Sequence, residues 1–292
     1  MTTVLEEPIT DWYASHGRDL PWRRPGVGAW PIMVSEFMLQ QTPVSRVLPA
    51  YEAWLNRWPT PSALAAATPG DAVRQWDRLG YPRRALRLHE SAVIITTTHA
   101  GEVPQDLAAL RSLPGVGIYT AAAIATFAYA QRHPVLDTNV RRVLSRLLTG
   151  NQYPPATLSV AEQSLAESLL PPETDHRAAT WSVALMELGA LICTSTRPAC
   201  DTCPVATSCA WLRNGRPDGV QPRRAQPYEG SDRQLRGRLL AVLRTTVTPV
   251  PQSAFNGICP EQHQLNRVLG ALITDGLATR LPTGLIALPG DS

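Results

Sequence analysis

Apolar residues recur along most of this chain at the three- and four-residue spacing of amphipathic helices. The pattern covers residues 34–57, 83–98, 106–112, 118–130, 138–149, 159–169 and 175–192. Short runs containing Pro and Gly separate these segments. In the segment 138–149, a single helical face would hold Val140, Val143, Leu144, Leu147 and Leu148. The spacing therefore predicts an all-α body that ends near residue 209.

The pattern changes after residue 209. Residues 210–231 are polar and rich in Pro, Gly and Arg, which predicts a linker. Apolar spacing then predicts helices over 233–246 and 261–275, and a hairpin that turns at Pro282-Thr283-Gly284. This order predicts a winged-helix-like module over 232–292.

Winged-helix modules often bind DNA through their second helix. In this chain that helix contains Arg267 and His263 but little other positive charge. A role in protein docking or packing is therefore the alternative for the module.

The formal net charge of +3 hides an uneven distribution. Residues 1–209 hold 17 Arg against 18 acidic residues, and residues 210–292 hold 10 Arg against 6. The excess lies in 213–244, which favours a polyanion partner, although a solvated linker would show the same composition. No apolar run is long enough to span a membrane, so no membrane partner is expected.

All 27 basic residues are Arg, and the chain contains no Lys. Chemistry that needs a Lys amine to form a Schiff base is therefore excluded.

Four of the five cysteines fall within seventeen residues, at Cys193, Cys200, Cys203 and Cys209. The chain starts with an acidic segment that has no apolar run, so we expect an intracellular protein without disulfides. Clustered thiols then indicate a metal site, either an iron–sulfur cluster or zinc. Only one short C-x2-C gap is present, which favours the cluster over zinc. Cys259 stands apart and is expected to be an ordinary thiol.

Three further features are candidates for anion binding and for acid–base chemistry. The stretch Leu113-Pro114-Gly115-Val116-Gly117 precedes a predicted helix and could cradle a phosphate with its backbone amides. Asp137 lies just before another helix, where it is either an N-cap or a functional carboxylate. Glu36 lies among apolar residues and either faces solvent or faces inward, where burial disfavours the charged form and favours proton donation.

Together these features resemble the endonuclease III superfamily of DNA glycosylases, and in particular its MutY-type adenine DNA glycosylases. The resemblance covers residues from about 10 to 209. It is carried by Pro21-Trp22-Arg23, Ser35-Glu36-Phe37-Met38-Leu39-Gln40-Gln41-Thr42, Leu79-Gly80-Tyr81, LPGVG with Tyr119, LDTNVRRVLSR, and Met186-Glu187-Leu188-Gly189-Ala190-Leu191-Ile192-Cys193.

The resemblance implies a helix-hairpin-helix glycosylase fold with a [4Fe–4S] cluster on the four cysteines. It divides the body into a six-helix domain at about 21–133 and a cluster domain made of about 1–20 with 134–209. The implied substrate is double-stranded DNA with adenine opposite 8-oxoguanine or guanine. The implied protein is a monomer that works in the cytoplasm, on the nucleoid.

The resemblance also implies residue roles. Glu36 would protonate the departing adenine, and Asp137 would stabilise the sugar cation, supported by Asn139. Tyr119 replaces the imine-forming Lys of bifunctional relatives, so the abasic strand should remain intact. The other implied pocket residues, around the adenine that is flipped out of the duplex, are Trp22, Arg23, Leu39 and Glu187. Gln41 and Tyr81 would enter the duplex and fill the gap that this base leaves. The backbone of Gly115, Val116 and Gly117 would contact a DNA phosphate.

The chain departs from the family pattern at two places. Pro82 follows Tyr81 where relatives often have a second aromatic residue. The 83 residues after Cys209 are expected to form a linker and a winged-helix-like module, whereas many relatives have there a longer β-rich domain that recognises 8-oxoguanine. Two alternatives remain: a thymine or uracil mismatch glycosylase, and a DNA-binding regulator that uses the cluster as a sensor. Glu36 argues against both, because protonation at N7 is purine chemistry and a regulator needs no acid there.

Overall fold

A computed structural model describes residues 2–172, 177–219, 228–259 and 261–292. In these ranges the chain is mainly helical, and its strands are limited to β1 (Thr279–Arg280) and β2 (Ile286–Ala287). The predicted all-α class is therefore confirmed. None of the described helices combines the length and the apolar character that crossing a bilayer requires.

The chain forms two compact units. The first contains Met1–Ile32, Gln105–Leu107 and Gly117–Arg223, and the second contains Met33–Pro104, Ala108–Val116 and Arg224–Ser292. Two helices contribute residues to both units, α2 (Ala29–Leu39) and α7 (Leu107–Ser112).

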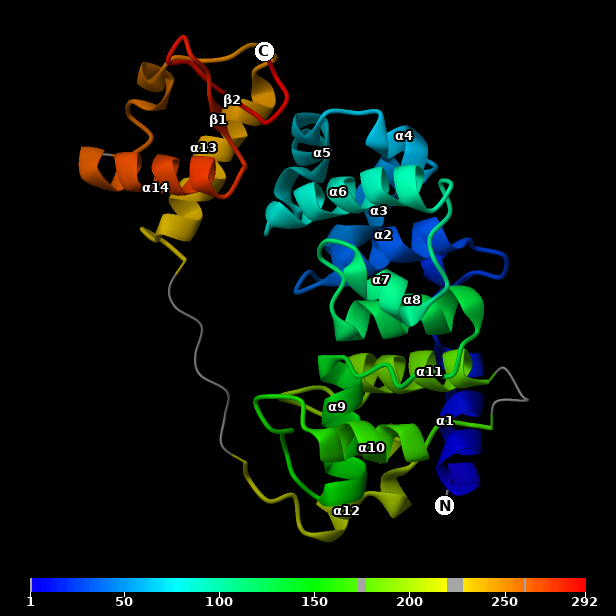
Figure 1. Cartoon of the computed structure of the whole chain (residues 1–292). Coiled ribbons are helices and arrows are strands. Elements are labelled where there is room, and N and C mark those ends of the chain that lie inside the picture. The colour runs from blue at the N-terminus through cyan, green and yellow to red at the C-terminus, as the bar shows by residue number, and fades with distance from the viewer. Residues whose placement is uncertain (1, 173–176, 220–227, 260) are drawn as a thin grey trace. The chain divides into compact units, whose positions relative to one another are not determined.

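The first unit is built from helices and short helical turns (Figure 1). They are α1 (Thr2–His16), η1 (Pro21–Arg23), α8 (Ile118–Tyr129), α9 (Thr138–Leu144), the π-helical turn η3 (Ser145–Thr149), α10 (Val160–Ser168), α11 (Ala178–Leu191), the 3₁₀ turns η5 (Cys200–Thr202) and η6 (Ala206–Ser208), and α12 (Ala210–Arg213).

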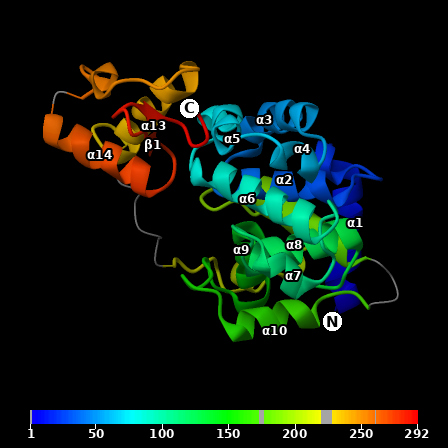
Figure 2. The ribbon, with the colours of Figure 1, turned by 45° about the horizontal axis from the view of Figure 1, so that its top comes forward.

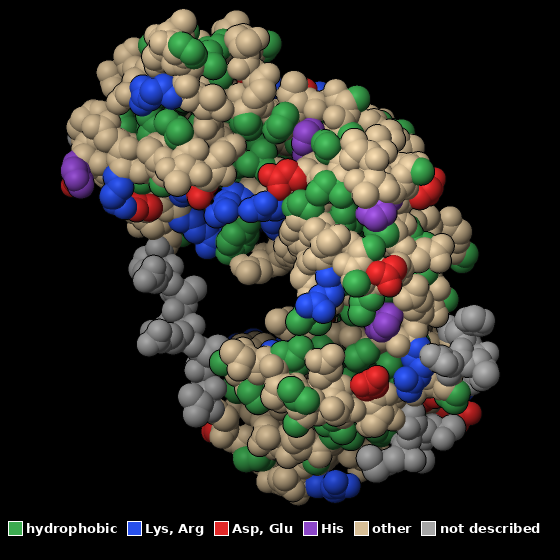
Figure 3. All heavy atoms as spheres, viewed as in Figure 1, with side chains coloured by type: hydrophobic (Ala, Val, Ile, Leu, Met, Phe, Trp, Pro, Cys, Tyr) green, Lys and Arg blue, Asp and Glu red, His purple; other side chains and the backbone are tan. Residues whose placement is uncertain are grey.

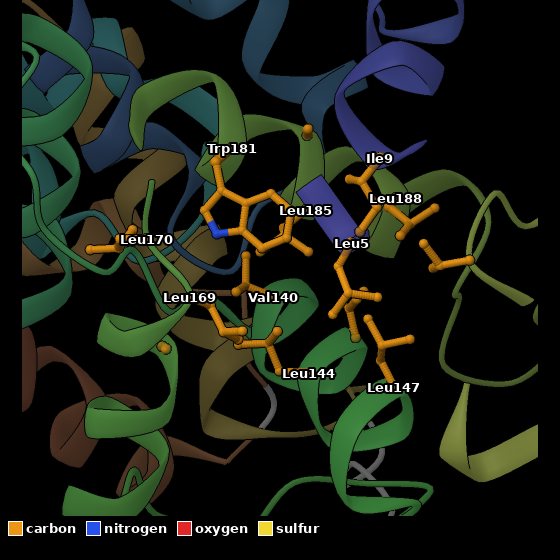
Figure 4. Close-up of a cluster of buried hydrophobic side chains, with 14 of the residues drawn as sticks. Leu5, Ile9, Val140, Leu144, Leu147, Leu169, Leu170, Trp181, Leu185 and Leu188 are labelled. Carbon is orange, nitrogen blue, oxygen red and sulfur yellow. The ribbon is translucent and has the colours of Figure 1, made fainter. Parts of the chain in front are cut away.

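The core of the first unit gathers side chains from α1, α9, α10 and α11 (Figure 4). Trp181, Leu185 and Leu188 of α11 pack there with Val140 and Leu144 of α9. The apolar face predicted for 138–149 is thus buried where its spacing indicated, although the α-helix ends at Leu144 and continues as the π-helical turn.

The second unit holds the remaining elements (Figure 2). They are α3 (Val44–Arg57), α4 (Pro61–Ala65), α5 (Pro69–Trp76), η2 (Asp77–Leu79), α6 (Arg83–Thr98), α13 (Asp232–Thr245), η7 (Gln252–Phe255), α14 (Gln262–Thr274), β1 and β2. Trp54 of α3 is fully buried and meets the rings of Trp58 and Trp76 edge to face, at centroid distances of 4.7 and 5.6 Å. These contacts pack α3 against α5.

The prediction of one helix over 34–57 was wrong. The segment contains α2 and α3, separated at residues 40–43, where Gln41 has a φ of +55°. Pro43 is the N-cap of α3, and a proline disfavours helical geometry at the preceding residue, here Thr42. Helix α1 was not predicted, and among its residues of described burial the buried apolar ones are the pair Leu5 and Ile9.

The C-terminal segment forms α13, α14 and the predicted hairpin, which pairs Thr279 with Ala287 and Arg280 with Ile286. Val250 adds an isolated antiparallel bridge to Ile286. Gly284 supplies the left-handed turn residue, with a φ of +83°. The description of this segment as a winged-helix-like module remains an interpretation.

The C-terminal segment packs within the second unit. Val73 of α5 belongs to the same buried cluster as Leu239 and Leu269. The amide of Gly70 also donates to the carbonyl of Pro289 at 2.7 Å. Of the predicted linker 210–231, residues 210–213 form α12 and residues 220–227 lie outside the described ranges. Residues 175 and 176 of the predicted helix 175–192 also lie outside them.

Candidate active site

Asp137 is held at the N-terminus of α9. Its Oδ1 accepts a hydrogen bond from the Val140 amide at 2.6 Å, and its Oδ2 accepts one from Asn139 Nδ2 at 2.8 Å. Desolvation raises the pKa of Asp137, and these two hydrogen bonds oppose that rise. The carboxylate is half-buried, so it is both fixed in direction and accessible on one side.

A second layer of contacts orients Asn139. Its Oδ1 accepts from Arg142 Nη2 at 2.8 Å, so its amide nitrogen faces Asp137. Arg142 in turn donates to the carbonyls of Gly189 at 2.6 Å and Cys193 at 2.8 Å. Gly189 brings α11 close to α9, because a Cβ at that position would meet the Asn139 carbonyl oxygen at 2.9 Å. The direction of the Asp137 carboxylate therefore depends on α11.

Glu187 is fully buried in α11 and is bound by two arginines. Arg18 contacts it through Nε at 2.5 Å and Nη2 at 2.9 Å, and Arg23 contacts it through Nη1 at 2.7 Å. Desolvation alone would raise the pKa of Glu187, but the Arg18 hydrogen bonds and the charge of Arg23 outweigh it and lower the pKa to about 2. Two predicted pocket residues, Arg23 and Glu187, thus form one ion-pair cluster.

Two other residues that the sequence predicts for the site, Trp22 and Tyr119, lie in the first unit. Trp22 is 7% exposed in η1, between Pro21 and Arg23. Tyr119 is half-buried in the first turn of α8.

Glu36 lies in α2, which is buried on several faces. Its side chain is 4% exposed, and Met33, Val34 and Phe37 beside it are fully buried. It therefore faces inward rather than toward solvent. Leu39 is half-buried at the last residue of the same helix.

The glycine loop between α7 and α8 turns at Gly115, whose φ of +82° favours glycine. A Cβ at Gly115 would meet Phe37 Cε1 at 2.9 Å, so the loop packs closely on α2. Gly117 has ordinary backbone angles and open space around its α-carbon. Gly115 and Gly117 are exposed, whereas Val116 is buried and its amide donates to the Leu113 carbonyl.

Gln41 and Tyr81 share an uncommon backbone geometry. Both are exposed non-glycine residues in the left-handed region, with φ of +55° and +48°. Such residues carry strain of about 1–3 kcal/mol and occur often at functional sites. Both line the same groove in the second unit.

Arg84 holds the two loops that carry Gln41 and Tyr81. It donates to the carbonyls of Phe37, Met38 and Gln40 at 2.7, 3.0 and 2.6 Å, and to that of Gly80 at 3.0 Å. Desolvation lowers the pKa of Arg84 to about 10. The sequence patterns did not identify this residue, although Arg84 stands four residues before Leu88 on the buried face of α6, where an apolar residue is expected.

The four clustered cysteines are half-buried and none forms a disulfide. Turns η5 and η6 fold the chain back between them, and Cys193, Cys203 and Cys209 pack against the core of the first unit. Desolvation raises the pKa of Cys203 to about 11, and the three other thiols of the cluster raise it as well. The four sulfur atoms therefore lie within electrostatic reach of one another.

Arg146 supports this loop from the core side. It is 1% exposed, contacts the sulfur of Cys193 at 3.4 Å, and donates to the carbonyls of Thr194 and Ser195 at 2.7 and 3.0 Å. Arg146 therefore ties the start of the cysteine loop to the core of the first unit.

Within the described ranges, no three His, Cys, Asp or Glu side chains are placed to hold a metal ion. A single zinc ion requires ligands that converge on one point. A [4Fe–4S] cluster takes its four thiolates at separate irons, so its ligands stand apart. Four thiols on one loop, joined by the turns η5 and η6, match the donor set of such a cluster.

The comparisons with known proteins identify relatives along the whole chain. The profile of the family described as HhH-GPD superfamily base excision DNA repair protein matches residues 34–167. The adenine DNA glycosylase of Mycolicibacterium smegmatis is 50% identical over 284 residues, which cover 97% of this chain and 95% of that protein. The human adenine DNA glycosylase is 40% identical over 217 residues, which cover 71% of this chain and 39% of the human protein.

Among solved structures, that of a thermostable thymine-DNA glycosylase superposes with a TM-score of 0.66 at 26% identity. The match covers 73% of this chain and 97% of that one. The fold is therefore shared with a glycosylase whose name gives a different base, so fold alone does not select adenine.

Proposed function

Because the chain belongs to the HhH-GPD superfamily of base excision DNA repair proteins, and within it to the adenine DNA glycosylases, we propose that it hydrolyses the N-glycosidic bond of adenine mispaired with 8-oxoguanine or guanine in duplex DNA. The family and the helix-hairpin-helix fold class predicted from the sequence motifs are confirmed. The mispair preference and the mechanism are the parts that we propose.

The observation that carries the proposal is the contrast between two carboxyl groups. Glu36 is 4% exposed in an apolar helix, which favours a protonated acid. Asp137 is half-buried, and although desolvation raises its pKa, the hydrogen bonds from Asn139 and Val140 oppose that rise and favour the carboxylate. Environments that differ in this way let one carboxyl donate a proton while the other stabilises positive charge.

In the proposed reaction, the adenine leaves the base stack at a cost of a few kcal/mol. Glu36 donates its proton to N7 of adenine, and the C–N bond breaks as the base departs neutral. The carboxylate of Asp137 stabilises the sugar cation while Asn139 keeps it in place. Water then adds to the sugar and gives a proton to the carboxylate of Glu36, which restores the acid.

The remaining predicted residues bind the DNA. Trp22, Arg23, Leu39 and Glu187 shape the base pocket, with Glu187 acting through the arginines that it binds. Tyr119 lies near the sugar. Gln41 and Tyr81 occupy the gap left by the base, and the Gly115–Gly117 turn contacts a phosphate.

We further propose that the enzyme leaves the abasic strand intact. The chain contains no Lys, so a side-chain imine cannot form. We expect a monomer that acts on nucleoid DNA in the cytoplasm, with a six-helix domain at about 21–133 and a cluster domain at about 1–20 with 134–209.

The proposal predicts base release from duplexes with adenine opposite 8-oxoguanine and opposite guanine, and little release from duplexes with adenine opposite cytosine or thymine opposite guanine. The labelled strand should break only after alkali or heat. The measurement is a single-turnover assay with and without alkali treatment. Release of thymine in place of adenine would select the thymine glycosylase alternative, and enzyme-dependent nicking would contradict the monofunctional mechanism.

The cofactor that we propose is a [4Fe–4S] cluster on Cys193, Cys200, Cys203 and Cys209. When bound, it joins the end of α11 to the start of α12, and no step of the proposed hydrolysis passes through it.

Protein purified without oxygen should contain about four irons and four acid-labile sulfides per chain. Iron and sulfide assays with visible absorption spectra measure this. Cys203→Ser should lower the iron content, whereas Cys259→Ser, which changes a thiol outside the cluster, should not. Stoichiometric zinc without sulfide would show that the cluster assignment is wrong.

A further inference from the structure

A groove of about 1110 Å³ lies in the second unit, beside α13 and the segment from Asp77 to Arg84. Its charged lining consists of eight arginines and one acid, Asp77. Four of the arginines come from α13 and four from residues 46–84. Figure 3 shows basic side chains, in blue, gathered there. We call this surface the arginine groove.

Five of these arginines have structural contacts, among them Arg46, which donates to the carbonyl of Arg78. Arg84 is buried among carbonyls, and Arg244 donates to the Val73 carbonyl at 3.2 Å. Arg83 and Arg236 both pair with Asp275, at 3.3 and 2.6 Å. These contacts account for their positions without a ligand.

Other arginines of the groove remain available. Arg78 and Arg238 are exposed, and neither side chain has a hydrogen bond or an ion pair in the described part of the chain. Like charges gathered without carboxylate partners repel one another, so their grouping is unfavourable unless an anion binds. The groove therefore has the electrostatic character of a polyanion site.

Aromatic rings stand at the edge of the groove. Arg233 of α13 lies over the ring of Tyr81 at 5.1 Å and over the ring of Tyr228 at 5.7 Å. Tyr81 is 43% exposed and Tyr228 is 55% exposed. Exposed aromatic rings between arginines are typical of surfaces that bind nucleic acid. Arg233 also connects α13 to the residue that we place in the duplex gap.

The second helix of the module is less suited to this role. Arg267 of α14 is engaged in an ion pair with Asp232. Of the two helices, α13 presents Arg233 and Arg238, which have no acidic partner among the described residues, although its Arg236 pairs with Asp275. The sequence left the second helix open between DNA binding and packing, and these contacts favour α13 as the DNA-facing helix.

We infer that the arginine groove binds the sugar-phosphate backbone of the duplex next to the gap, and that α13 is the DNA-facing helix of the C-terminal segment. This inference rests on the proposed function, because Gln41 and Tyr81 line the same groove. An acidic protein segment would suit the charge, but the exposed rings and the position of Gln41 and Tyr81 favour DNA.

The test uses the full-length double variant Arg233→Gln/Arg238→Gln. The control is Arg267→Gln/Arg280→Gln, which removes the same charge from the same segment but outside the groove. Binding to a fully paired duplex is measured across a series of salt concentrations, because that readout does not require base excision. Thermal unfolding of both variants checks that the fold is retained.

We expect the groove variant to bind DNA more weakly, by roughly tenfold for each arginine–phosphate hydrogen bond that the substitutions remove. Its slope of log affinity against log salt should be shallower by about 0.9 for each phosphate that is no longer neutralised. The control should stay close to the parent in both quantities. If the groove variant has the same DNA affinity and the same salt slope as the parent, the inference is wrong. It is also wrong if the groove variant loses the parent's binding to a polyglutamate peptide but binds DNA as the parent does, because the groove would then be a site for acidic protein.

Base excision separates this inference from the proposed function. If adenine release from an A·G duplex at saturating enzyme persists while DNA affinity is unchanged in the groove variant, the groove assignment is wrong and the function stands. If no duplex loses adenine but the groove variant binds DNA weakly, the proposed function is wrong and the groove assignment stands.

Discussion

Replacing Glu36 with Gln should lower the rate of adenine release by about 10²–10⁴-fold, the usual effect of losing general acid catalysis. Gln keeps the shape of the side chain within the buried surroundings of α2 but has no proton to give to N7. Binding to the mismatched duplex should persist, because Gln fills the same buried space and the exposed surface of the protein is unchanged. Single-turnover rates and binding isotherms on an A·8-oxoguanine duplex measure the two effects.

The matched control is Glu90→Gln, which removes an exposed carboxylate from α6 in the same unit. It should release adenine at the parental rate. Near-parental release by Glu36→Gln would show that the assigned acid is wrong.

Asp137→Asn tests the second carboxyl in the same assay. Asn is a good N-cap, so a purely structural role would be preserved. However, Asn139 directs its amide nitrogen toward position 137, and its orientation is fixed by Arg142. The substituted side chain would therefore lack the negative charge and one of the hydrogen bonds, and we expect a rate loss much larger than the change in stability.

Replacing Glu187 with Gln should lower the free energy of unfolding at pH 7 by about 3–5 kcal/mol, the usual cost of breaking a buried ion pair. Glu187 is fully buried, and its charge is balanced by Arg18 and Arg23. Removing the carboxylate leaves both guanidinium groups without their partner. Urea unfolding of the two proteins measures the loss.

The loss should depend on pH. The pKa of Glu187 is about 2 in the folded protein, below its ordinary value of 4.5. A carboxyl whose pKa is lowered by folding stabilises the folded protein at pH values above the pKa that it has in the unfolded chain. This contribution is lost as the pH falls from about 4.5 toward 2. The difference between parent and Glu187→Gln should therefore shrink over that range, by up to about 1.4 kcal/mol per pH unit.

Glu167→Gln is the control, because Glu167 is an exposed carboxylate of α10 in the same unit. It should change the free energy of unfolding by less than about 0.5 kcal/mol. If Glu187→Gln also lowers the free energy of unfolding by less than about 0.5 kcal/mol, the buried ion-pair assignment is wrong. A loss that is the same at pH 7 and at pH 3.5 would contradict it as well.

Local patterns along the chain were enough to identify the helical class, the family and the residue types that the chemistry needs. Helical spacing at 138–149 identified the buried face of α9, because a period of 3.6 residues is a local property of the chain. The four cysteines, the absence of Lys and the Leu113–Gly117 turn are also local, so they could be identified without coordinates. The segment 34–57 was misjudged because its apolar spacing continues across the break at residues 40–43.

The partners of these residues follow from how the helices pack. Arg84 contacts the end of α2 more than forty positions earlier, and Arg18 contacts Glu187 at a separation of 169 positions. The arginine groove likewise combines α13 with residues 46–84. A spacing rule along the chain contains no information on such contacts, because they depend on how separate helices pack. Composition showed that the C-terminal segment is basic, but only folding selected α13 as the helix with available arginines.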